Sequence, residues 1–310
     1  MAKYILKRLF WAAVTLFVIM FILFLLLEFM PGSPFNDEKL SSDQLDVLRA
    51  HYGLDKPFIE KFWIFLKNGV KGNFGNSYSI STNVEVSKII LPRLGVSVRI
   101  GLQALLLGSV VGVILGLISG SNQNTWKDTA STVLSVIGVS IPSFVFALLL
   151  AYFVGFKLRL FPITYNINKP FSSSVLSTIA LSMFTLAQVT RFLRTELVEV
   201  MGSEYIRLAR TKGVPRTKLF FKHGLRNALI SVVTIIGPLT VNLLTGSLAV
   251  EKLFSIPGVG RLLVDSISRR DFNITIMIAF IYSAMYITVN LVVDILYGII
   301  DPRIRVGKGG

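Results

Sequence analysis

The chain has 310 residues, of which 53% are apolar and 16% are charged, and it carries 32 Lys and Arg against 17 Asp and Glu. A water-soluble globular domain usually has about 25% charged residues, so this composition excludes an ordinary soluble enzyme and indicates a membrane protein. The sequence contains no cysteine, which excludes a disulfide framework, a thiolate metal site and a cysteine nucleophile.

Six stretches of at least 19 residues contain no Asp, Glu, Lys or Arg. About 20 apolar residues at 1.5 Å rise cross a hydrocarbon core of roughly 30 Å, so each stretch is long enough for one transmembrane helix. The sequence therefore predicts an all-α polytopic membrane protein with six transmembrane helices. The stretches are 9–27, 100–126, 129–156, 170–190, 227–250 and 272–293.

The first stretch follows three basic residues, Lys3, Lys7 and Arg8, as the apolar core of a signal peptide does. Such a core has about 7–15 residues and ends at small residues, whereas this stretch has 19 and leaves through Glu28 and Pro31. We therefore expect a first helix that is retained in the protein.

The first loop is the only segment large enough for a small structure outside the bilayer. Ser42 is expected to cap a short helix that ends at Gly53, and a second helix is expected to begin at Pro57. The second helix is amphipathic, so it suits either the membrane interface or packing on the helix bundle, and the sequence leaves both open. Its apolar residues are Phe58, Phe62, Trp63, Phe65 and Leu66.

Small residues recur at every fourth position of the second stretch. This spacing lines one helix face and lets another backbone approach closely, so it indicates helix packing rather than a binding site. Gly138 and Pro142 in the third stretch, and Gly237 and Pro238 in the fifth, are expected to kink their helices. The small residues are Ala104, Gly108, Gly112, Gly116 and Gly120.

Polar side chains are rare inside the six stretches. Gln188 and Asn242 are the candidates for a translocation path, which the sequence otherwise leaves unknown. Asp294 lies just beyond the last stretch, where pairing with a loop arginine at the membrane surface is favoured over a role in a proton relay.

The loop 191–226 contains nine basic and three acidic residues and has the clearest helix signals outside the spans. Ser203 is expected to cap a short helix, Glu204 to complement its dipole, and Gly213 with Pro215 to end it. An apolar strip of Tyr205, Leu208 and Ala209 would face a partner protein, or the helix would be an ordinary solvated loop. The expected basic rim is Arg207, Arg210 and Lys212.

Lys and Arg residues divide equally, 16 to each side, when the N-terminus is placed inside. Nine of the outside charges lie in the long first loop, which crosses the membrane largely regardless of charge, and without them the count is 16 against 7. Both termini are therefore expected in the cytoplasm. No nucleic-acid partner is expected, because the basic residues are spread over both faces and belong to no recognisable module.

Five segments together resemble the dipeptide, oligopeptide and nickel permease family of bacterial ABC importers, in the style of its B-type subunit. EYIRLARTKGVPRTKLFFKHGLRNAL, at 204–229, is similar to the "EAA" loop of that family. The other segments are EKLFSIPGVGRLLVDSISRRD at 251–271, NLVVDILYGIIDPRIR at 290–305, GLDKP at 53–57 and GNFGNSY at 72–78.

The resemblance implies a type I importer permease fold in which the EAA loop forms a cytoplasmic coupling helix seated in a cleft of an ATPase. Ala209 and Gly213 match the second alanine and the glycine of the loop, and Leu225 matches its later leucine. Arg226 replaces the proline of the general pattern. The residues expected to couple to the ATPase are Glu204, Tyr205, Arg207, Leu208, Ala209, Arg210, Lys212 and Gly213.

The resemblance further implies a permease subunit for oligopeptide import in the bacterial inner or plasma membrane, and not an enzyme. Its expected partners are a second homologous permease, two ATPase subunits that bind ATP and Mg, an extracytoplasmic peptide-binding protein and the lipid bilayer. The chain itself is expected to hold no cofactor or metal. The implied organisation is a first transmembrane helix (1–30), an extracytoplasmic loop domain (31–95), a core permease domain (96–300) and a cytoplasmic tail (301–310).

Three alternatives stay open at this point. The same fold could import dipeptides or nickel, although no span contains a histidine that would favour a metal path. An intramembrane protease built on Ser140 would need a histidine in a neighbouring span, and His51 and His223 lie in none. A self-contained channel would not need the coupling loop.

Overall fold

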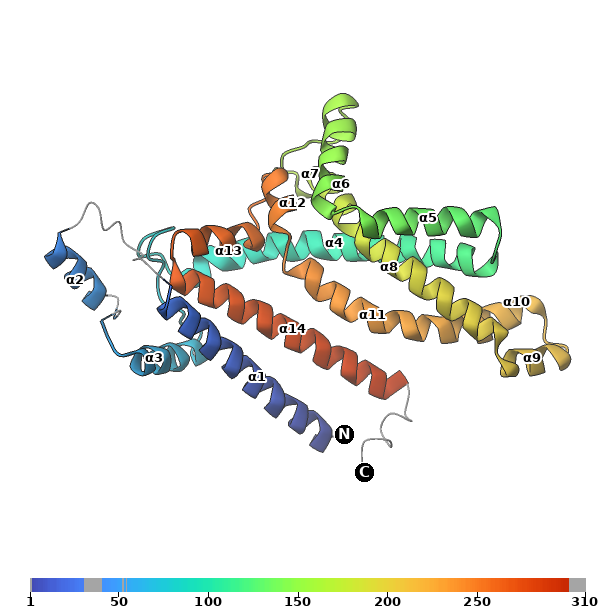
Figure 1. Cartoon of the computed structure of the whole chain (residues 1–310), viewed down its shortest axis with the longest axis horizontal. Coiled ribbons are helices and arrows are strands. Elements are labelled where there is room, and N and C mark those ends of the chain that lie inside the picture. The colour runs from blue at the N-terminus through green and yellow to red at the C-terminus, as the bar shows by residue number, and fades with distance from the viewer. Residues whose placement is uncertain (1, 31–40, 52, 54, 301–310) are drawn as a thin grey trace. The chain divides into compact units, whose positions relative to one another are not determined.

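The computed structural model describes residues 2–30, 41–51, 53 and 55–300 (Figure 1). In this part of the chain the regular elements are helices, apart from one isolated bridge between Asn76 and Glu85. The α-helices are α1 (Ala2–Glu28), α2 (Ser42–His51), α3 (Phe58–Val70), α4 (Val86–Ser121), α5 (Trp126–Ser140), α6 (Ser143–Leu150), α7 (Pro170–Ser173), α8 (Val175–Gly202), α9 (Glu204–Thr211), α10 (Arg216–Lys218), α11 (Arg226–Leu244), α12 (Leu248–Leu253), α13 (Val259–Ser268) and α14 (Phe272–Ile300); η2 (Ala151–Lys157) and η3 (Leu219–Leu225) are π-helical.

Five helical segments are long and apolar enough to cross a membrane, and a bent helix pair supplies a sixth if the pair counts as one span. The predicted all-α polytopic fold is therefore confirmed. The five segments are Leu6–Glu28, Val86–Ser121, Val175–Gly202, Leu219–Leu244 and Phe272–Val293.

Helix ends differ from the ends of the charge-free stretches. α4 already ends at Ser121, whereas α8 runs past the charged Arg191 to Gly202. α11 ends at Leu244, where Gly246 adopts a φ of 78° and the chain turns into the separate helix α12. The predicted stretch 227–250 therefore holds two helices, because a left-handed glycine turn leaves no mark in a charge pattern.

The third predicted span is bent by 105° between α5 and α6. α5 ends at Ser140, and Pro142 precedes the first residue of α6, where its missing N–H costs no helical hydrogen bond. The kink expected at Pro142 is confirmed. α11 continues through Pro238, so the fifth span is not interrupted there, and the kink expected at Gly237 and Pro238 stays a prediction.

The chain forms two compact units. The first unit comprises Met1–Val96 and Pro257–Thr288, and one of its cores joins the start of α4, α13 and the start of α14. The buried Asp271 at the N-terminal end of α14 accepts hydrogen bonds from Ser77 Oγ (2.5 Å) and from the Ser79 and Ile80 N–H groups (both 3.0 Å). This carboxylate therefore holds the 77–80 loop against the helix.

The second unit comprises Ser97–Ile256 and Val289–Gly310, and α8 lies at its centre in contact with α5, α6 and α11. Glycines of α4 also lie directly on α8. A Cβ atom built at Gly112 would stand 2.8 Å from Val189 Cβ, and one at Gly116 would stand 2.9 Å from Leu193 Cβ. The packing role predicted for the small residues is confirmed, and the helix that they pack against is α8.

Candidate functional site

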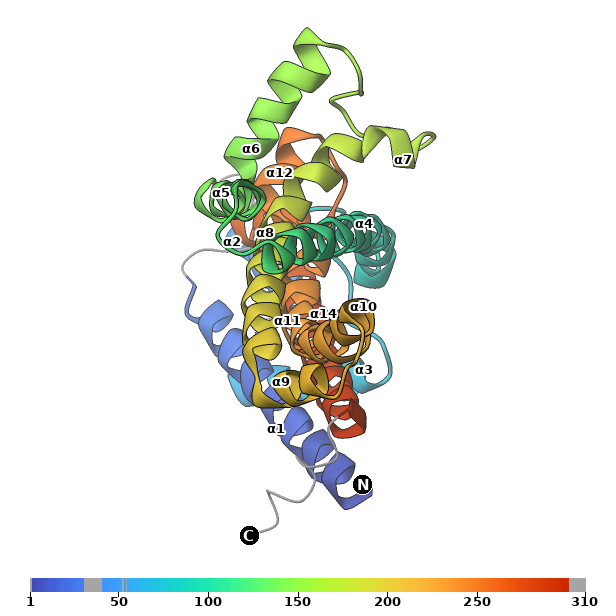
Figure 2. The ribbon, with the colours of Figure 1, turned by 90° about the vertical axis from the view of Figure 1, so that its right-hand side faces the viewer.

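The segment 191–226 contains much more helix than the loop expected from its charges. α8 extends to Gly202, α9 follows at once, and the chain returns through α10 and η3 into α11. Figures 1 and 2 show α9 at the end of α8, turned away from the axis of that helix. α9 is therefore attached directly to the end of α8.

α9 begins where the sequence predicts, but its cap differs. Ser203 has the extended backbone of an N-cap residue (φ −67°, ψ 156°), whereas its hydroxyl donates to the Val200 carbonyl at 2.5 Å and makes no cap hydrogen bond. The predicted N-cap position is therefore confirmed, although the side chain makes no cap hydrogen bond. Ser203 instead joins the end of α8 to the start of α9, because its hydroxyl satisfies a terminal carbonyl of α8.

α9 ends in a Schellman motif at Gly213. The Gly213 N–H donates to the Arg210 carbonyl (3.0 Å), and the Val214 N–H donates to the Ala209 carbonyl (3.2 Å). Gly213 itself has a φ of 75°, a left-handed conformation that glycine adopts without the steric cost of a Cβ atom. The predicted end of the helix at Gly213 is therefore confirmed.

Ile206 anchors α9, and sequence reasoning missed this residue. Its side chain is fully buried, and α9 contacts both α8 and η3. At the edge of this contact, Asn227 Nδ2 donates to the Tyr205 hydroxyl at 2.8 Å. A single isoleucine on an eight-residue helix gives no periodic pattern, so only the apolar residues of η3 could have indicated a buried face.

The exposed side of α9 carries most of the predicted coupling residues. Leu208 is 56% exposed and Tyr205 43% exposed, and Ala209 is half-buried beside them. An apolar patch with a charged border is thus presented away from the unit. The charged residues around it, all exposed, are Glu204, Arg207, Arg210 and Lys212.

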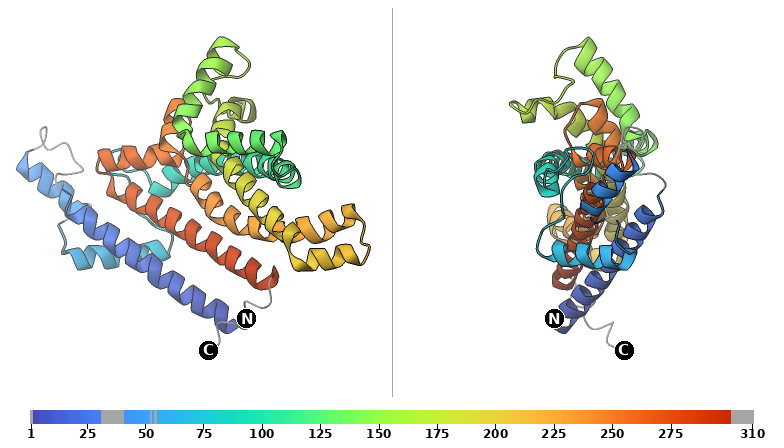
Figure 3. Two further views of the ribbon diagram at one scale, coloured as in Figure 1. Left: turned by 45° about the vertical axis from the view of Figure 1, so that its right-hand side comes forward. Right: turned by 90° about the vertical axis from the view of Figure 1, so that its left-hand side faces the viewer.

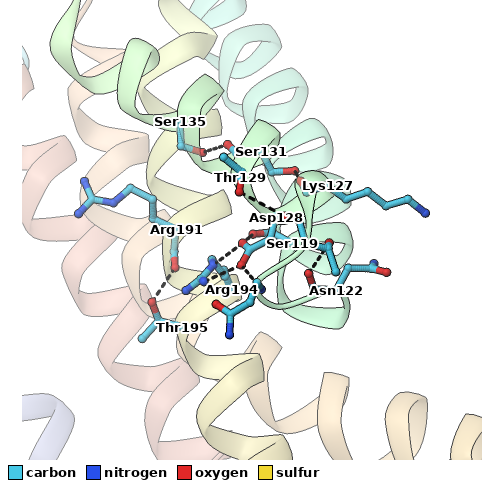
Figure 4. Close-up of polar contacts among 12 residues, drawn as sticks. Ser119, Asn122, Lys127, Asp128, Thr129, Ser131, Ser135, Arg191, Arg194 and Thr195 are labelled. Atoms are coloured by element: carbon cyan, nitrogen blue, oxygen red, sulfur yellow. Dashed lines mark hydrogen bonds and ion pairs between the residues drawn. The ribbon is translucent and has the colours of Figure 1, made fainter.

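An ion pair fixes the part of α8 that leads into α9 (Figure 4). Arg194 Nε lies 2.7 Å from Asp128 Oδ1, and Arg194 Nη2 lies 2.8 Å from Asp128 Oδ2, in a bidentate arrangement. The same carboxylate accepts hydrogen bonds from Ser119 Oγ (2.5 Å) and the Asn124 N–H (3.0 Å). Bidentate pairs fix direction as well as distance, so α8 is held to the turn between α4 and α5. We call these four residues the α8 clamp.

The two candidates for the translocation path lie on neighbouring helices. Gln188 is half-buried on α8, and Asn242 is exposed on α11, which packs against α8. Their role in the path stays a prediction.

The family of binding-protein-dependent transport system inner membrane components matches residues 112–306, and the N-terminal component of such systems matches residues 1–100. The chain belongs to this family. The resemblance found in the sequence motifs is therefore confirmed over nearly the whole chain.

Curated relatives of this inner membrane component cover the chain almost completely. The dipeptide transport system permease protein DppB of Lactococcus lactis is 45% identical over 98% of this chain and 100% of its own length. DppB of Bacillus subtilis is 38% identical over 100% of both chains, and the oligopeptide transport system permease protein OppB of Haemophilus influenzae is 34% identical over 98% of this chain and 100% of its own. These relatives are transport permeases, which confirms that the chain is not an enzyme.

A solved structure supports the fold of the inner membrane component. The crystal structure of an amino acid ABC transporter with histidines aligns with a TM-score of 0.54 and 17% sequence identity, and the alignment covers 68% of this chain and 93% of that one. At this identity the likeness shows the permease fold alone.

Proposed function

We propose that this chain is the membrane-spanning permease subunit of an ATP-driven importer for peptides, and that α9 is its coupling helix. The observation that carries the proposal is the geometry of α9. Ile206 and the Ser203 hydrogen bond attach the helix to α8, while Leu208 and Tyr205 stay exposed. An exposed apolar patch with a basic border, carried at the end of the central helix α8, suits the cleft of a cytosolic partner.

The partners follow from the same assignment. A second homologous permease encloses the path together with this chain, two ATPase subunits bind ATP and Mg on the cytosolic side, and an extracytoplasmic peptide-binding protein delivers the cargo. Both termini then lie in the cytoplasm, and residues 31–95 lie outside. The chain contributes a shift between two packings of its helices, which the ATPases and the binding protein bias.

Peptides are the cargo that the relatives favour. Oligopeptide import is our first assignment, and dipeptide import is the second, because the relative with 45% identity is a dipeptide permease. Uptake of labelled peptides of increasing length by cells that carry or lack this chain separates the two. Uptake that does not depend on the chain for any length would contradict peptide import.

Leu208→Asp is expected to abolish co-purification of the ATPase subunits while the chain still inserts and accumulates. The side chain is largely exposed, so a charge there costs the fold little, whereas an apolar contact with a partner is lost. Quantitative pull-down from membranes measures the effect, with Thr211→Asp, also exposed on α9, as the matched control. Equal recovery of ATPase with both variants would count against docking through Leu208.

Gly213→Val is expected to leave the protein inserted but to uncouple transport. A Cβ atom at this position meets no atom within 4 Å, so the effect is backbone strain alone. A left-handed conformation costs a residue with a Cβ atom roughly 1–2 kcal/mol, and β-branched side chains fit it worst, so the Schellman turn opens and α9 is misdirected.

Gly213→Asn separates strain from added bulk, because asparagine tolerates the left-handed region. Peptide uptake in cells should fall strongly for Gly213→Val and stay close to wild type for Gly213→Asn, at equal membrane levels of the chain. Unchanged uptake with Gly213→Val would overturn the assignment of α9 as the coupling helix.

A further inference from the structure

Helix α3 lies against the membrane-spanning helix α1 (Figure 3). Phenylalanine side chains form this contact. Phe62, which is 3% exposed, makes edge contacts with Phe17, Phe21 and Phe24 of α1, at ring-centroid distances of 5.6, 5.2 and 5.6 Å. Packing on the bundle, one of the two placements that the sequence left open, is therefore found. The contact also fixes the level of α3 along α1.

That level lies inside the apolar part of α1. The charge-free stretch of α1 is 19 residues long, or about 28 Å, which is close to the thickness of the hydrocarbon core. The boundary of the core therefore lies near Glu28, where the stretch ends. Phe21 is seven residues before Glu28, or about 10 Å deeper, so Phe62 is held below the boundary.

Lys61 shows which side of α3 faces the boundary. Its Nζ lies 2.7 Å from both carboxylate oxygens of Glu28, and its side chain is only 12% exposed. This arrangement is typical of a lysine whose aliphatic stem lies along apolar surface while its charged end reaches the membrane surface. The Lys61 side of α3 therefore faces the headgroups.

The opposite side of α3 carries an exposed apolar stripe. At about 100° per residue, Ile59, Trp63 and Val70 lie about 160°, 200° and 180° around the helix from Lys61. These three side chains are 56%, 62% and 90% exposed. The Ile59–Trp63–Val70 stripe is thus directed toward the bilayer centre, and on α1 the apolar side chains of Ile22 and Leu26 are exposed as well.

We propose that α3 is an interfacial helix, embedded in the leaflet at the Glu28 end of α1, with the Ile59–Trp63–Val70 stripe among the lipid acyl chains. Amphipathic helices of this kind lie about 5–10 Å into the boundary between headgroups and chains, the level at which Phe62 is held. Tryptophan is enriched at this depth. Glu60 and Lys67 lie on the sides of α3, and their length lets their charged ends reach the headgroups.

The absence of cysteine from the sequence makes a direct test possible. Single cysteines at Ile59 and Val70 are labelled with a nitroxide in the full chain in lipid nanodiscs, and collisions with oxygen and with a water-soluble nickel chelate are measured. Asn68→Cys, half-buried and about 20° from Lys61 around the same helix, is the control on the headgroup side. The ratio of oxygen to nickel collisions should be severalfold higher at positions 59 and 70 than at position 68.

Two results would overturn the proposal. Nickel access at positions 59 and 70 equal to that at position 68 would place the stripe in water, and exclusion of both reagents would place it against protein. A second measurement leaves the stripe intact and uses the fluorescence of Trp63. In the variant Trp11→Phe/Trp126→Phe, Trp63 is the one remaining tryptophan. Its fluorescence should be quenched by lipids brominated high on the acyl chain more than by lipids brominated near the chain end, and a lack of quenching by either would contradict embedding.

Discussion

Arg194→Ala is expected to lower the unfolding midpoint of the chain in nanodiscs by about 5–10 °C and to reduce peptide uptake. The Asp128 side chain is 6% exposed, so removal of Arg194 leaves a buried carboxylate with only the Ser119 and Asn124 donors. Loss of one partner of a buried pair costs about 3–5 kcal/mol, and the 30% exposure of Arg194 puts the effect near the lower limit. Thermal unfolding followed by circular dichroism measures the midpoint.

The direction of the hydrogen bonds makes the α8 clamp specific. A charge swap, Asp128→Arg/Arg194→Asp, should not restore the midpoint, because the Ser119 hydroxyl and the Asn124 N–H both donate to position 128. The apolar pair Asp128→Leu/Arg194→Met should restore most of it, since well-packed apolar side chains often replace a buried ion pair without loss. Uptake should stay low in the apolar variant if the clamp sets the direction of α8.

Lys127→Ala is the matched control for the clamp. Lys127 is adjacent to Asp128 but exposed, and its side chain points away from the ion pair (Figure 4). Its replacement should change the free energy of unfolding by less than about 1 kcal/mol, so the midpoint should stay close to that of the unchanged chain. An equal midpoint for Lys127→Ala and Arg194→Ala would show that the Asp128–Arg194 pair contributes no more than a surface contact.

Charge-free stretches predict that spans exist but not where helices end. The length rule locates each span because water is absent from the hydrocarbon core and every backbone group must bond within its own helix. Helix ends depend on other features: α8 runs past Arg191 because its backbone bonds continue, and α11 ends near Gly246 because of a left-handed turn. Neither feature appears in a count of charges.

Local signals predicted the C-terminal end of α9 but not its support. Gly213 followed by Pro215 is a stop that depends only on backbone conformation, so the sequence shows it directly. The α8 clamp joins Asp128 to Arg194, 66 positions apart, and both residues lie outside the charge-free stretches. Contacts at such separation depend on how the helices pack, which the pattern of a single helix does not encode.

The alternatives for α3 show a similar limit. Phe58, Phe62 and Phe65 occur together with Ile59 and Trp63 in the sequence, so apolar residues cover more than one side of the helix. The phenylalanine side packs on α1, and the stripe on another side stays exposed. A helical pattern predicts how many apolar sides exist, but only the packing assigns each to its neighbour.

Gly112→Leu is expected to prevent the chain from accumulating in the membrane, the second large effect. A Cβ atom at Gly112 would lie 2.8 Å from Val189 Cβ and 2.9 Å from the Leu186 carbonyl oxygen, so α4 and α8 would have to separate. Separation would also lengthen the hydrogen bond from Thr190 Oγ1 to the Gly112 carbonyl, now 3.2 Å. Overpacking a core typically costs about 1–3 kcal/mol and occasionally more, and a leucine adds several atoms where the first already has no room.

Gly95 provides the matched comparison for Gly112 on the same helix. A Cβ atom at Gly95 meets no atom within 4 Å, so Gly95→Ala should be neutral or stabilising by up to about 1 kcal/mol, the helix propensity gained. Gly112→Ala gains the same propensity but meets α8, so it should accumulate less than Gly95→Ala and more than Gly112→Leu. Quantitative immunoblots of membranes rank the three variants, and equal levels of Gly95→Ala and Gly112→Leu would show that α4 and α8 do not need this close approach.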